Sequence, residues 1–134
     1  MGATPEGEVR LSGDGLPELQ SMPPREFDGP GGFWSPETLL VAAVADCFTL
    51  SFRSIAKASR LEWIELTAEV HGLLERSEGV ARFTRFETHA RLVVPAGTDP
   101  ARARMLMEKA EKICLIANSL SAARHLECDV IEEP

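Results

Sequence analysis

The chain has 134 residues, of which 44% are hydrophobic and 26% charged, so we expect a single domain over residues 1–134 with a core of its own. Its formal net charge of −7 argues against nucleic acid and anionic membranes as partners, since both attract clustered Lys and Arg. The N-terminus shows no secretory signal, and the longest apolar stretch is shorter than the roughly 18 residues of a spanning helix. We therefore expect a cytoplasmic protein.

Residues 1–34 are rich in Gly and Pro, as in "GDGLPELQSMPPREFDGPGG". Clusters of these residues mark turns and loops. We expect no more than short strands in this segment, near residues 8–11 and 18–21.

A long helix is expected next, running to about Ser59. Ser35 suits the N-cap, and Pro36 suits the first helical position. On a helical wheel, Cys47 lies between an apolar face and a polar seam, beside small residues, so that a substrate or another backbone could approach it. The apolar face consists of Val41, Val44, Phe48, Phe52 and Ile55, and the seam consists of Asp46, Thr49, Arg53 and Lys57.

After this helix, two runs alternate between apolar and polar residues, which is the pattern of half-buried strands. They cover about residues 64–76 and 81–95, and the turn "SEG" between them predicts an antiparallel hairpin. We expect their buried faces to hold Ile64, Leu66, Ala68, Val70 and Leu74 on the first strand and Phe86, Thr88, Ala90, Leu92 and Val94 on the second.

A second helix should begin at Asp99 and Pro100, which suit the cap and the first helical position. A break is expected near Asn118 or Ser119, followed by a short helical turn. The segment "LECDVIEE" then predicts a closing strand, with Cys128 among its core residues. This order of elements indicates an α+β fold.

The chain has three cysteines, an odd number, and their spacing is irregular. They therefore do not form a disulfide framework. Each alone is typical of a buried apolar residue. Cys47 lies eleven residues, about 16 Å, from the helix start, too far for the helix dipole to lower its pKa. A reactive Cys47 therefore needs a nearby cation.

No metal site or cofactor is predicted. His125 and Cys128 are three residues apart, but no second close pair of ligands accompanies them. There is no phosphate-binding loop, nucleophile elbow or dinucleotide fingerprint.

Two motifs are similar to those of the OsmC/Ohr family, the osmotically inducible and organic hydroperoxide resistance proteins. In "SPETLLVAAVADCF", Ser-Pro-Glu is followed by two apolar residues, a run of small residues and Cys-Phe. In "KAEKICLIANSL", a cysteine stands four residues before an asparagine. The resemblance covers roughly residues 33–131, and the predicted order of elements is consistent with it.

The resemblance implies an intertwined homodimer, in which long central helices pack together against antiparallel sheets. It also implies that two cysteines reduce organic hydroperoxides. Cys47 matches the peroxidatic cysteine, which becomes a sulfenic acid, and Cys114 matches the resolving cysteine, which closes a disulfide with it. A dithiol reductant, in this family often a lipoyl group, then restores both thiols.

Glu37 matches the family glutamate that pairs with an arginine beside the reactive thiol. Because Glu37 and Cys47 are ten residues, about 15 Å, apart on one helix, a shared site would need one of them from the partner chain. The family arginine comes from an early strand or loop. Arg10 and Arg25 are the candidates, and we favour Arg10.

Asp46 departs from the small residue common before the family cysteine, and a carboxylate there would raise the thiol pKa unless it is paired. The wheel places Asp46 near Arg53, so that a salt bridge would neutralise it. We expect Phe48, Phe33 and Trp34 to line an apolar substrate pocket. The alternatives are a non-catalytic dimer that binds an apolar ligand and a disulfide exchange with a protein partner.

Overall fold

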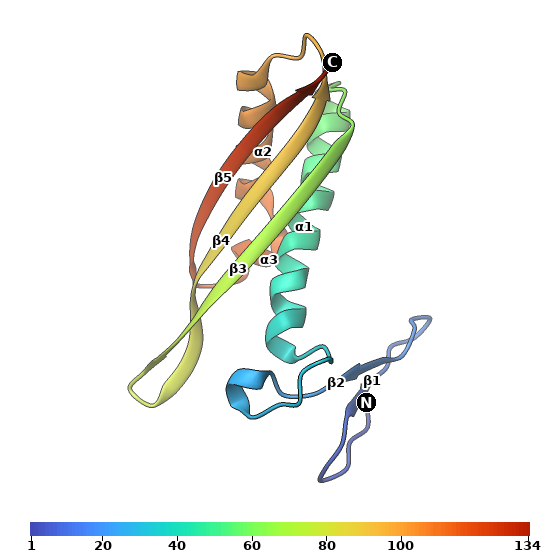
Figure 1. Ribbon diagram of the computed structural model, residues 1–134, viewed down its shortest axis with the longest axis vertical. Helices are drawn as coiled ribbons and strands as arrows, with labels where there is room; N and C mark the ends of the chain where they lie inside the picture. The colour runs from blue at the N-terminus through green and yellow to red at the C-terminus, as the bar shows by residue number, and fades with distance from the viewer. The chain divides into compact units, whose positions relative to one another are not determined.

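The computed structural model describes residues 1–134, which form two compact units, Met1–Leu40 and Val41–Pro134. The order of elements is that of an α+β fold, as predicted (Figure 1). In chain order they are β1 (Val9–Leu11), β2 (Leu19–Ser21), the 3-10 helix η1 (Arg25–Phe27), α1 (Pro36–Ala58), β3 (Glu65–Ser77), β4 (Val80–Pro95), α2 (Pro100–Ile113), α3 (Leu115–Asn118) and β5 (Ala123–Glu133).

The first unit contains the two short strands expected between the turns. β1 and β2 pair antiparallel, with Val9 opposite Ser21 and Leu11 opposite Leu19. The loop after η1 is closely packed. At Gly31, where φ is +75°, an added Cβ would meet the Arg25 side chain. Only glycine combines this φ with such a close approach.

The start of α1 is capped as predicted. The Thr38 backbone N–H donates to the Ser35 hydroxyl at 3.1 Å, and the Ser35 N–H donates to the Thr38 hydroxyl at 2.8 Å. This reciprocal pair is a capping box in which threonine replaces the usual Glu or Gln. At the other end, Arg60 adopts φ 57° and the Leu61 N–H donates to the Ala56 carbonyl at 2.9 Å, which ends the helix.

The second unit is built on a three-stranded sheet in the order β3-β4-β5. β3 and β4 form the expected antiparallel hairpin, whose two turn residues, Glu78 and Gly79, have φ of 52° and 78°. β5, however, pairs parallel with β4, so the sheet is mixed where an antiparallel sheet was expected. A parallel neighbour requires a crossover connection, and the segment that contains α2 supplies it.

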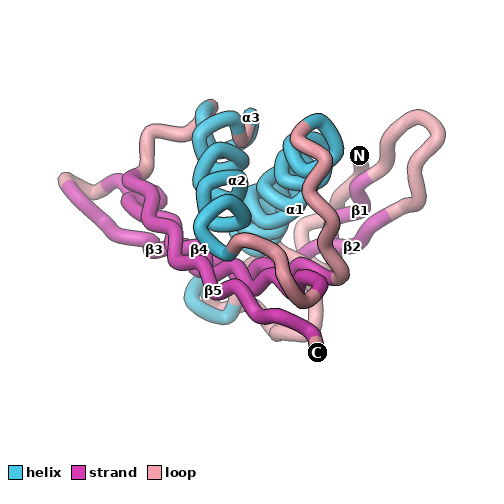
Figure 2. Tube along the Cα trace, turned by 90° about the horizontal axis from the view of Figure 1, so that it is seen from above, coloured by secondary structure: helices cyan, strands magenta, loops and turns pink.

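The helices α1 and α2 lie on the same face of this sheet (Figure 2). The core forms between them and the sheet, and the predicted buried face of β4 is confirmed there, with Phe86, Thr88, Ala90, Leu92 and Val94 all buried. The prediction for Ile64 is wrong. It precedes β3, outside the alternation of the strand, and is 49% exposed.

The predicted break in the second helix is also wrong in position. α2 begins as predicted, with the Ala101 N–H donating to the Asp99 carboxylate at 3.0 Å. It ends at Ile113, because Cys114 adopts φ −59° and ψ 106° and turns the chain. The short helix α3 therefore ends at Asn118, whereas a helical turn was expected to follow that residue.

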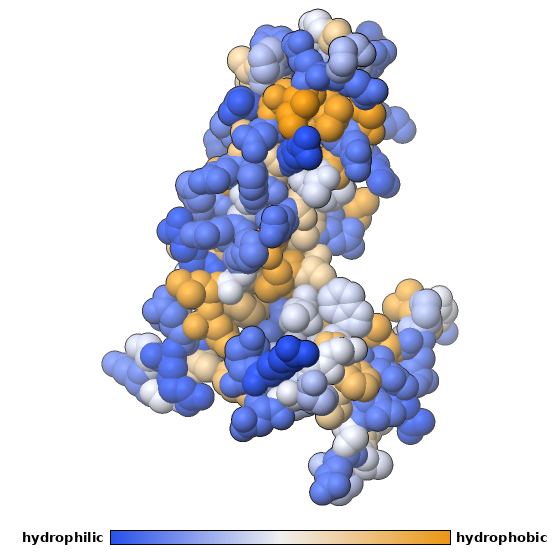
Figure 3. All heavy atoms as spheres, viewed as in Figure 1, coloured by the Kyte–Doolittle hydropathy of each residue, from blue (hydrophilic) through white to orange (hydrophobic).

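The opposite face of the sheet is hydrophilic over its middle (Figure 3). Its exposed side chains come from the alternate positions of the strands, and the register sets acidic residues opposite histidines. Glu69 of β3 faces His89 of β4, and Glu87 of β4 faces His125 of β5. Burial on one face and exposure on the other explains the alternation in the sequence.

Candidate functional site

Cys47 of α1 and Cys114, at the corner between α2 and α3, meet in the second unit. Their side chains interact with each other, although they are 67 positions apart in the sequence. Cys47 also lines a groove of about 580 Å³ between α1 and the α2–α3 corner. The other lining residues are Ala43, Asp46, Leu50, Ser51, Ser54, Ile113, Leu115 and Ile116.

The surroundings of Cys47 lower its pKa below the usual value of 9.0. Partial burial acts to raise the pKa, because it disfavours the thiolate. Hydrogen bonding outweighs this effect. It comes from the backbone N–H of Ile116, the Cys114 and Ser51 side chains and the N–H of Leu115. Donors aimed at a sulfur stabilise its anion, so Cys47 is the thiol disposed to ionise.

Cys114 is shifted in the opposite direction. It is fully buried, and burial raises its pKa to about 11. Interaction with Cys47 and the charge of Glu111 act in the same sense. Cys128, which packs against the core from β5 as predicted, also has a pKa raised by burial to about 11. Thiols with such values stay protonated at neutral pH, and only Cys47 is poised as a nucleophile.

Arg10 and Arg25, the cations expected beside Cys47, both lie in the first unit. Within the second unit, the groups that lower the pKa of Cys47 are all hydrogen-bond donors. The expected salt bridge between Asp46 and Arg53 does not form either, and both side chains are exposed. Residues seven apart on a helix lie two turns from each other, and solvent screens the pair. Asp46 instead lines the groove.

The prediction that Phe48 lines the substrate pocket is wrong. It is 0% exposed and belongs to the core, so it does not line the groove beside Cys47. Phe33 and Trp34 lie in the first unit, where they line a separate groove of about 530 Å³ with residues of β2. Their contact with a substrate stays a prediction.

The charged residues that the resemblance assigned to the site belong to the first unit. Arg10 lies in β1 and Arg25 in η1, and both are exposed. Glu37 lies in the first turn of α1, and its Oε2 is buried without a hydrogen-bond partner in the chain. A buried carboxylate oxygen of this kind requires a donor, which the chain by itself does not provide.

The helical wheel places Ser51 beside Cys47, and the resemblance points to Cys114. The backbone donors to Cys47, the N–H groups of Leu115 and Ile116, were missed in the sequence. Every residue has such a group, so composition carries no signal for it. They reach Cys47 because the chain turns at Cys114, and that turn was expected four residues later.

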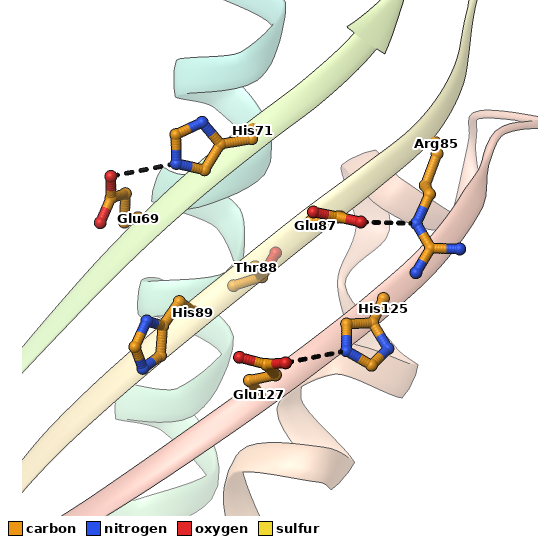
Figure 4. Close-up of a pocket in the computed structure, with 8 residues that line it drawn as sticks. All are labelled: Glu69, His71, Arg85, Glu87, Thr88, His89, His125 and Glu127. Atoms are coloured by element: carbon orange, nitrogen blue, oxygen red, sulfur yellow. Dashed lines mark hydrogen bonds and ion pairs between the residues drawn. The ribbon is translucent and has the colours of Figure 1, made fainter.

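A second pocket, of about 290 Å³, lies on the hydrophilic face of the sheet (Figure 4). Each histidine there contacts a carboxylate: His71 contacts Glu69 at 3.0 Å and His125 contacts Glu127 at 3.4 Å. His89 contacts Asp129 at 2.6 Å, and this hydrogen bond raises the pKa of His89. The side chains are largely exposed and paired with one another, so this pocket is a solvated network of hydrogen bonds and ion pairs. No group of three or more His, Cys, Asp or Glu residues is arranged to hold a metal ion.

Residues 29–129 match the OsmC-like protein family, and the chain belongs to that family. This match includes both cysteines of the groove. A curated relative, the uncharacterized protein YmaD of Bacillus subtilis, is 28% identical over 109 residues, which are 79% of this chain and 73% of that protein.

The fold is also that of solved OsmC-like structures. An OsmC-like protein of unknown function from Vibrio cholerae superposes with a TM-score of 0.83 at 22% identity, covering 91% of this chain and 84% of that one. An organic hydroperoxide resistance protein OsmC from Legionella pneumophila has a TM-score of 0.72 at 23% identity, covering 96% and 99%. An organic hydroperoxide resistance protein from Elizabethkingia anophelis has a TM-score of 0.73 at 20% identity, covering 95% of each chain.

Proposed function

We propose that the chain is a thiol-dependent peroxidase that reduces organic hydroperoxides through Cys47 and Cys114. The observation that carries the proposal is the contact between two thiols whose pKa values are shifted in opposite directions, that of Cys47 down and that of Cys114 up. The Cys47 thiol is therefore disposed to attack the substrate, and Cys114 stays protonated until it reacts with the oxidised Cys47. The names of several structural neighbours, which are hydroperoxide resistance proteins, support the same chemistry.

The reaction begins with the Cys47 thiolate, which attacks one oxygen of the hydroperoxide. The O–O bond breaks, and the alkoxide takes up a proton and leaves as an alcohol. Cys47 loses two electrons and becomes a sulfenic acid. The Cys114 sulfur then attacks the Cys47 sulfur, and its proton leaves with the hydroxyl group as water, so that a disulfide remains.

The reductant we propose is a small dithiol, such as a lipoyl group. One of its sulfurs attacks the disulfide and forms a mixed disulfide with the chain. Its second sulfur displaces the chain, which restores both cysteines and leaves the reductant as a cyclic disulfide. A supply of reduced dithiol is typical of the cytoplasm, which is where we propose that the protein acts.

The groove supports an alkyl or lipid hydroperoxide as substrate. Leu50, Ile113 and Leu115, which line it, are 49%, 49% and 67% exposed. Apolar side chains exposed around a reactive atom favour an apolar ligand, because binding removes their surface from water. Hydrogen peroxide has no apolar part and gains nothing from these contacts.

A homodimer is part of the proposal. In the most apolar 18-residue stretch of α1, mean hydropathy is 1.6 but only 28% of residues are buried. A helix of this length and composition could also cross a membrane, but the core helices of other proteins meet the same criterion. Packing of α1 against its copy would cover this surface, as the family resemblance implies.

A second candidate is a non-catalytic dimer that binds an apolar ligand. It is favoured by one observation, namely that no cation of the second unit contributes to the lowered pKa of Cys47. Hydrogen bonds alone stabilise a thiolate less than an adjacent positive charge does. In that case the groove would bind a ligand without changing it.

The two candidates are separated by counting free thiols after the reduced protein is treated with cumene hydroperoxide. A peroxidase loses two thiols per chain, because Cys47 and Cys114 form a disulfide. The variant Cys47→Ser should lose none. Cys114→Ser should accumulate a sulfenic acid that dimedone traps on Cys47.

Cys128→Ser is the matched control, since Cys128 lies outside the groove. It should still lose two thiols, and its rate should be that of the wild type. Wild-type protein whose thiols survive the hydroperoxide would contradict the peroxidase and favour the binding dimer.

A further inference from the structure

The corner between α2 and α3 holds most of the groups that face Cys47. Cys114 occupies the corner itself, with a backbone outside the helical region, and the N–H groups of Leu115 and Ile116 follow it. Four residues of helix follow the corner, too few to be stable alone. The position of the resolving thiol therefore depends on contacts from elsewhere in the fold.

Arg124, at the start of β5, makes those contacts with all three guanidinium nitrogens. Its Nε donates to the Glu111 carboxylate at 2.7 Å, in the last turn of α2. One terminal nitrogen donates to the Glu111 carbonyl, and the other donates to Oδ1 of Asn118 at 2.7 Å, at the end of α3. Asn118 in turn donates to the Lys112 carbonyl at 3.0 Å. A single side chain thus bonds the elements on both sides of the corner.

These contacts are partly shielded from water. The side chains of Arg124 and Glu111 are 25% and 15% exposed, respectively. The carboxylate of Glu111 forms an ion pair with Arg124 through Oε1. Its other oxygen, Oε2, is buried and has no hydrogen-bond partner. Arg124 is itself held by the sheet, where it lies opposite Phe86 of β4. The corner is therefore tied to the most extensively paired part of the unit.

We infer that Arg124 is a positioning residue for the thiol reaction, which fixes the α2–α3 corner so that Cys114 and the following N–H groups face Cys47. This inference rests on the proposed function for its role in turnover. Its structural basis is the planar guanidinium, which serves three acceptors in fixed directions. A lysine keeps the charge but offers a single nitrogen, so it cannot bond Glu111 and Asn118 in this arrangement.

The test compares Arg124→Lys and Arg124→Met with the wild type in two measurements that need no hydroperoxide. The first is the pH dependence of Cys47 alkylation by iodoacetamide, followed by mass spectrometry. The second is the rate at which diamide closes the Cys47–Cys114 disulfide, with diamide accepting the two hydrogens. Both variants should alkylate Cys47 only at higher pH, and both should close the disulfide about 10- to 100-fold more slowly, as misplaced reacting groups do.

Arg104→Met is the matched control. Arg104 also joins α2 to β5, by donating to the Cys128 carbonyl at 3.0 Å, but it bonds no residue of the corner. It should leave both measurements at their wild-type values. Asn118→Ala removes the contact of Arg124 with α3, together with the Asn118 bond to the Lys112 carbonyl, from an exposed position. It should slow closure in the same sense, and it keeps the test decisive if Arg124→Met does not fold.

Folded Arg124→Lys and Asn118→Ala proteins that close the disulfide at the wild-type rate would overturn the inference. A different result would overturn the proposed function instead. If the wild type closes the disulfide with diamide and the variants are slow, but cumene hydroperoxide consumes no thiols, the corner is positioned by Arg124 in a protein that is not a peroxidase.

Discussion

At the scale of single residues, the difference between Cys47 and Cys114 comes from their surroundings. Both are cysteines on or beside helices, and neither lies within the first turn of a long helix. Cys47 is partly exposed and receives hydrogen bonds, whereas Cys114 is fully buried. Donors favour the thiolate and burial favours the thiol, so the two pKa values move apart.

The first prediction concerns the Ser51 hydroxyl, which donates to Cys47 and so lowers the pKa of that thiol. Ser51→Ala removes one donor from the anion, so the pKa of Cys47 should rise. Below this pKa the thiolate is the minor form, and alkylation by iodoacetamide at neutral pH should slow about 2- to 10-fold, the effect of one hydrogen bond of about 0.5–1.5 kcal/mol.

Ser54→Ala is the control for this prediction. Ser54 lines the same groove but does not act on the Cys47 pKa. Its alkylation profile should follow that of the wild type. An unchanged midpoint in Ser51→Ala would show that the hydroxyl does not interact with the thiolate.

At the scale of secondary structure elements, the packing of β3 against α1 depends on Gly72. An added Cβ at this position would lie 2.7 Å from Cε1 of Phe83 on β4 and 3.1 Å from Cγ2 of Val41 on α1. The ring of Phe83 and the helix occupy the space that a side chain would need. Gly72 thus allows a strand, its neighbour and a helix to approach one another within the second unit.

The second prediction follows from this contact. Gly72→Ala should destabilise the protein, because overpacking costs about 1–3 kcal/mol, whereas alanine gains only about 0.4–1 kcal/mol by restricting the unfolded chain. Chemical denaturation, monitored by circular dichroism, measures the difference in the free energy of unfolding.

The double variant Gly72→Ala with Phe83→Leu tests the cause. The smaller leucine leaves room for the new methyl group, so the double variant should lose less stability than the two single variants summed. Strict additivity would mean that the ring of Phe83 is not what the alanine meets.

At the scale of the whole molecule, two residues that the resemblance assigns to one active site are far apart along α1. Glu37 and Cys47 lie on the same helix, about 15 Å apart along its axis. The buried Glu37 carboxylate lacks a donor within the chain, and much of the apolar surface of α1 is uncovered. The two-fold dimer that we propose would address all three observations. Packing α1 against its copy would cover the apolar surface, offer partner donors to Glu37, and bring Glu37 of one chain toward Cys47 of the other.

The third prediction is that two inactive variants complement each other. Glu37→Ala and Cys47→Ser should each lose most peroxidase activity as pure proteins. After unfolding together and refolding as a mixture, half of the dimers contain both chains, and one site in each has an intact Glu37 and an intact Cys47. About a quarter of the wild-type activity should return.

The refolded but unmixed variants serve as controls, together with sedimentation analysis of the oligomeric state. A mixture as inactive as its parents would place Glu37 and Cys47 of each site in the same chain, or remove Glu37 from the site.

Much of the local structure could be predicted because its signals are local. The hydroxyl of Ser35 and the carboxylate of Asp99 cap the helices that they precede. The alternation over residues 81–95 correctly predicts which side chains of β4 are buried. The two cysteine motifs led to the correct family through resemblance. Such features depend on residues a few positions apart, so the sequence alone shows the spacing that produces them.

The sequence by itself determined where α1 and α2 begin, the hairpin, the buried faces of α1 and β4, and the family. Only the tertiary structure decided that β5 pairs parallel with β4, that the second helix breaks at Cys114, and that Phe48 does not line the groove beside Cys47. These features depend on contacts between distant segments, such as Arg124 with Glu111 and Asn118. The break illustrates the reason. Local propensity allows a helix through Cys114, but the bonds from β5 stabilise a turn there, and tertiary contacts outweigh the small energies of propensity.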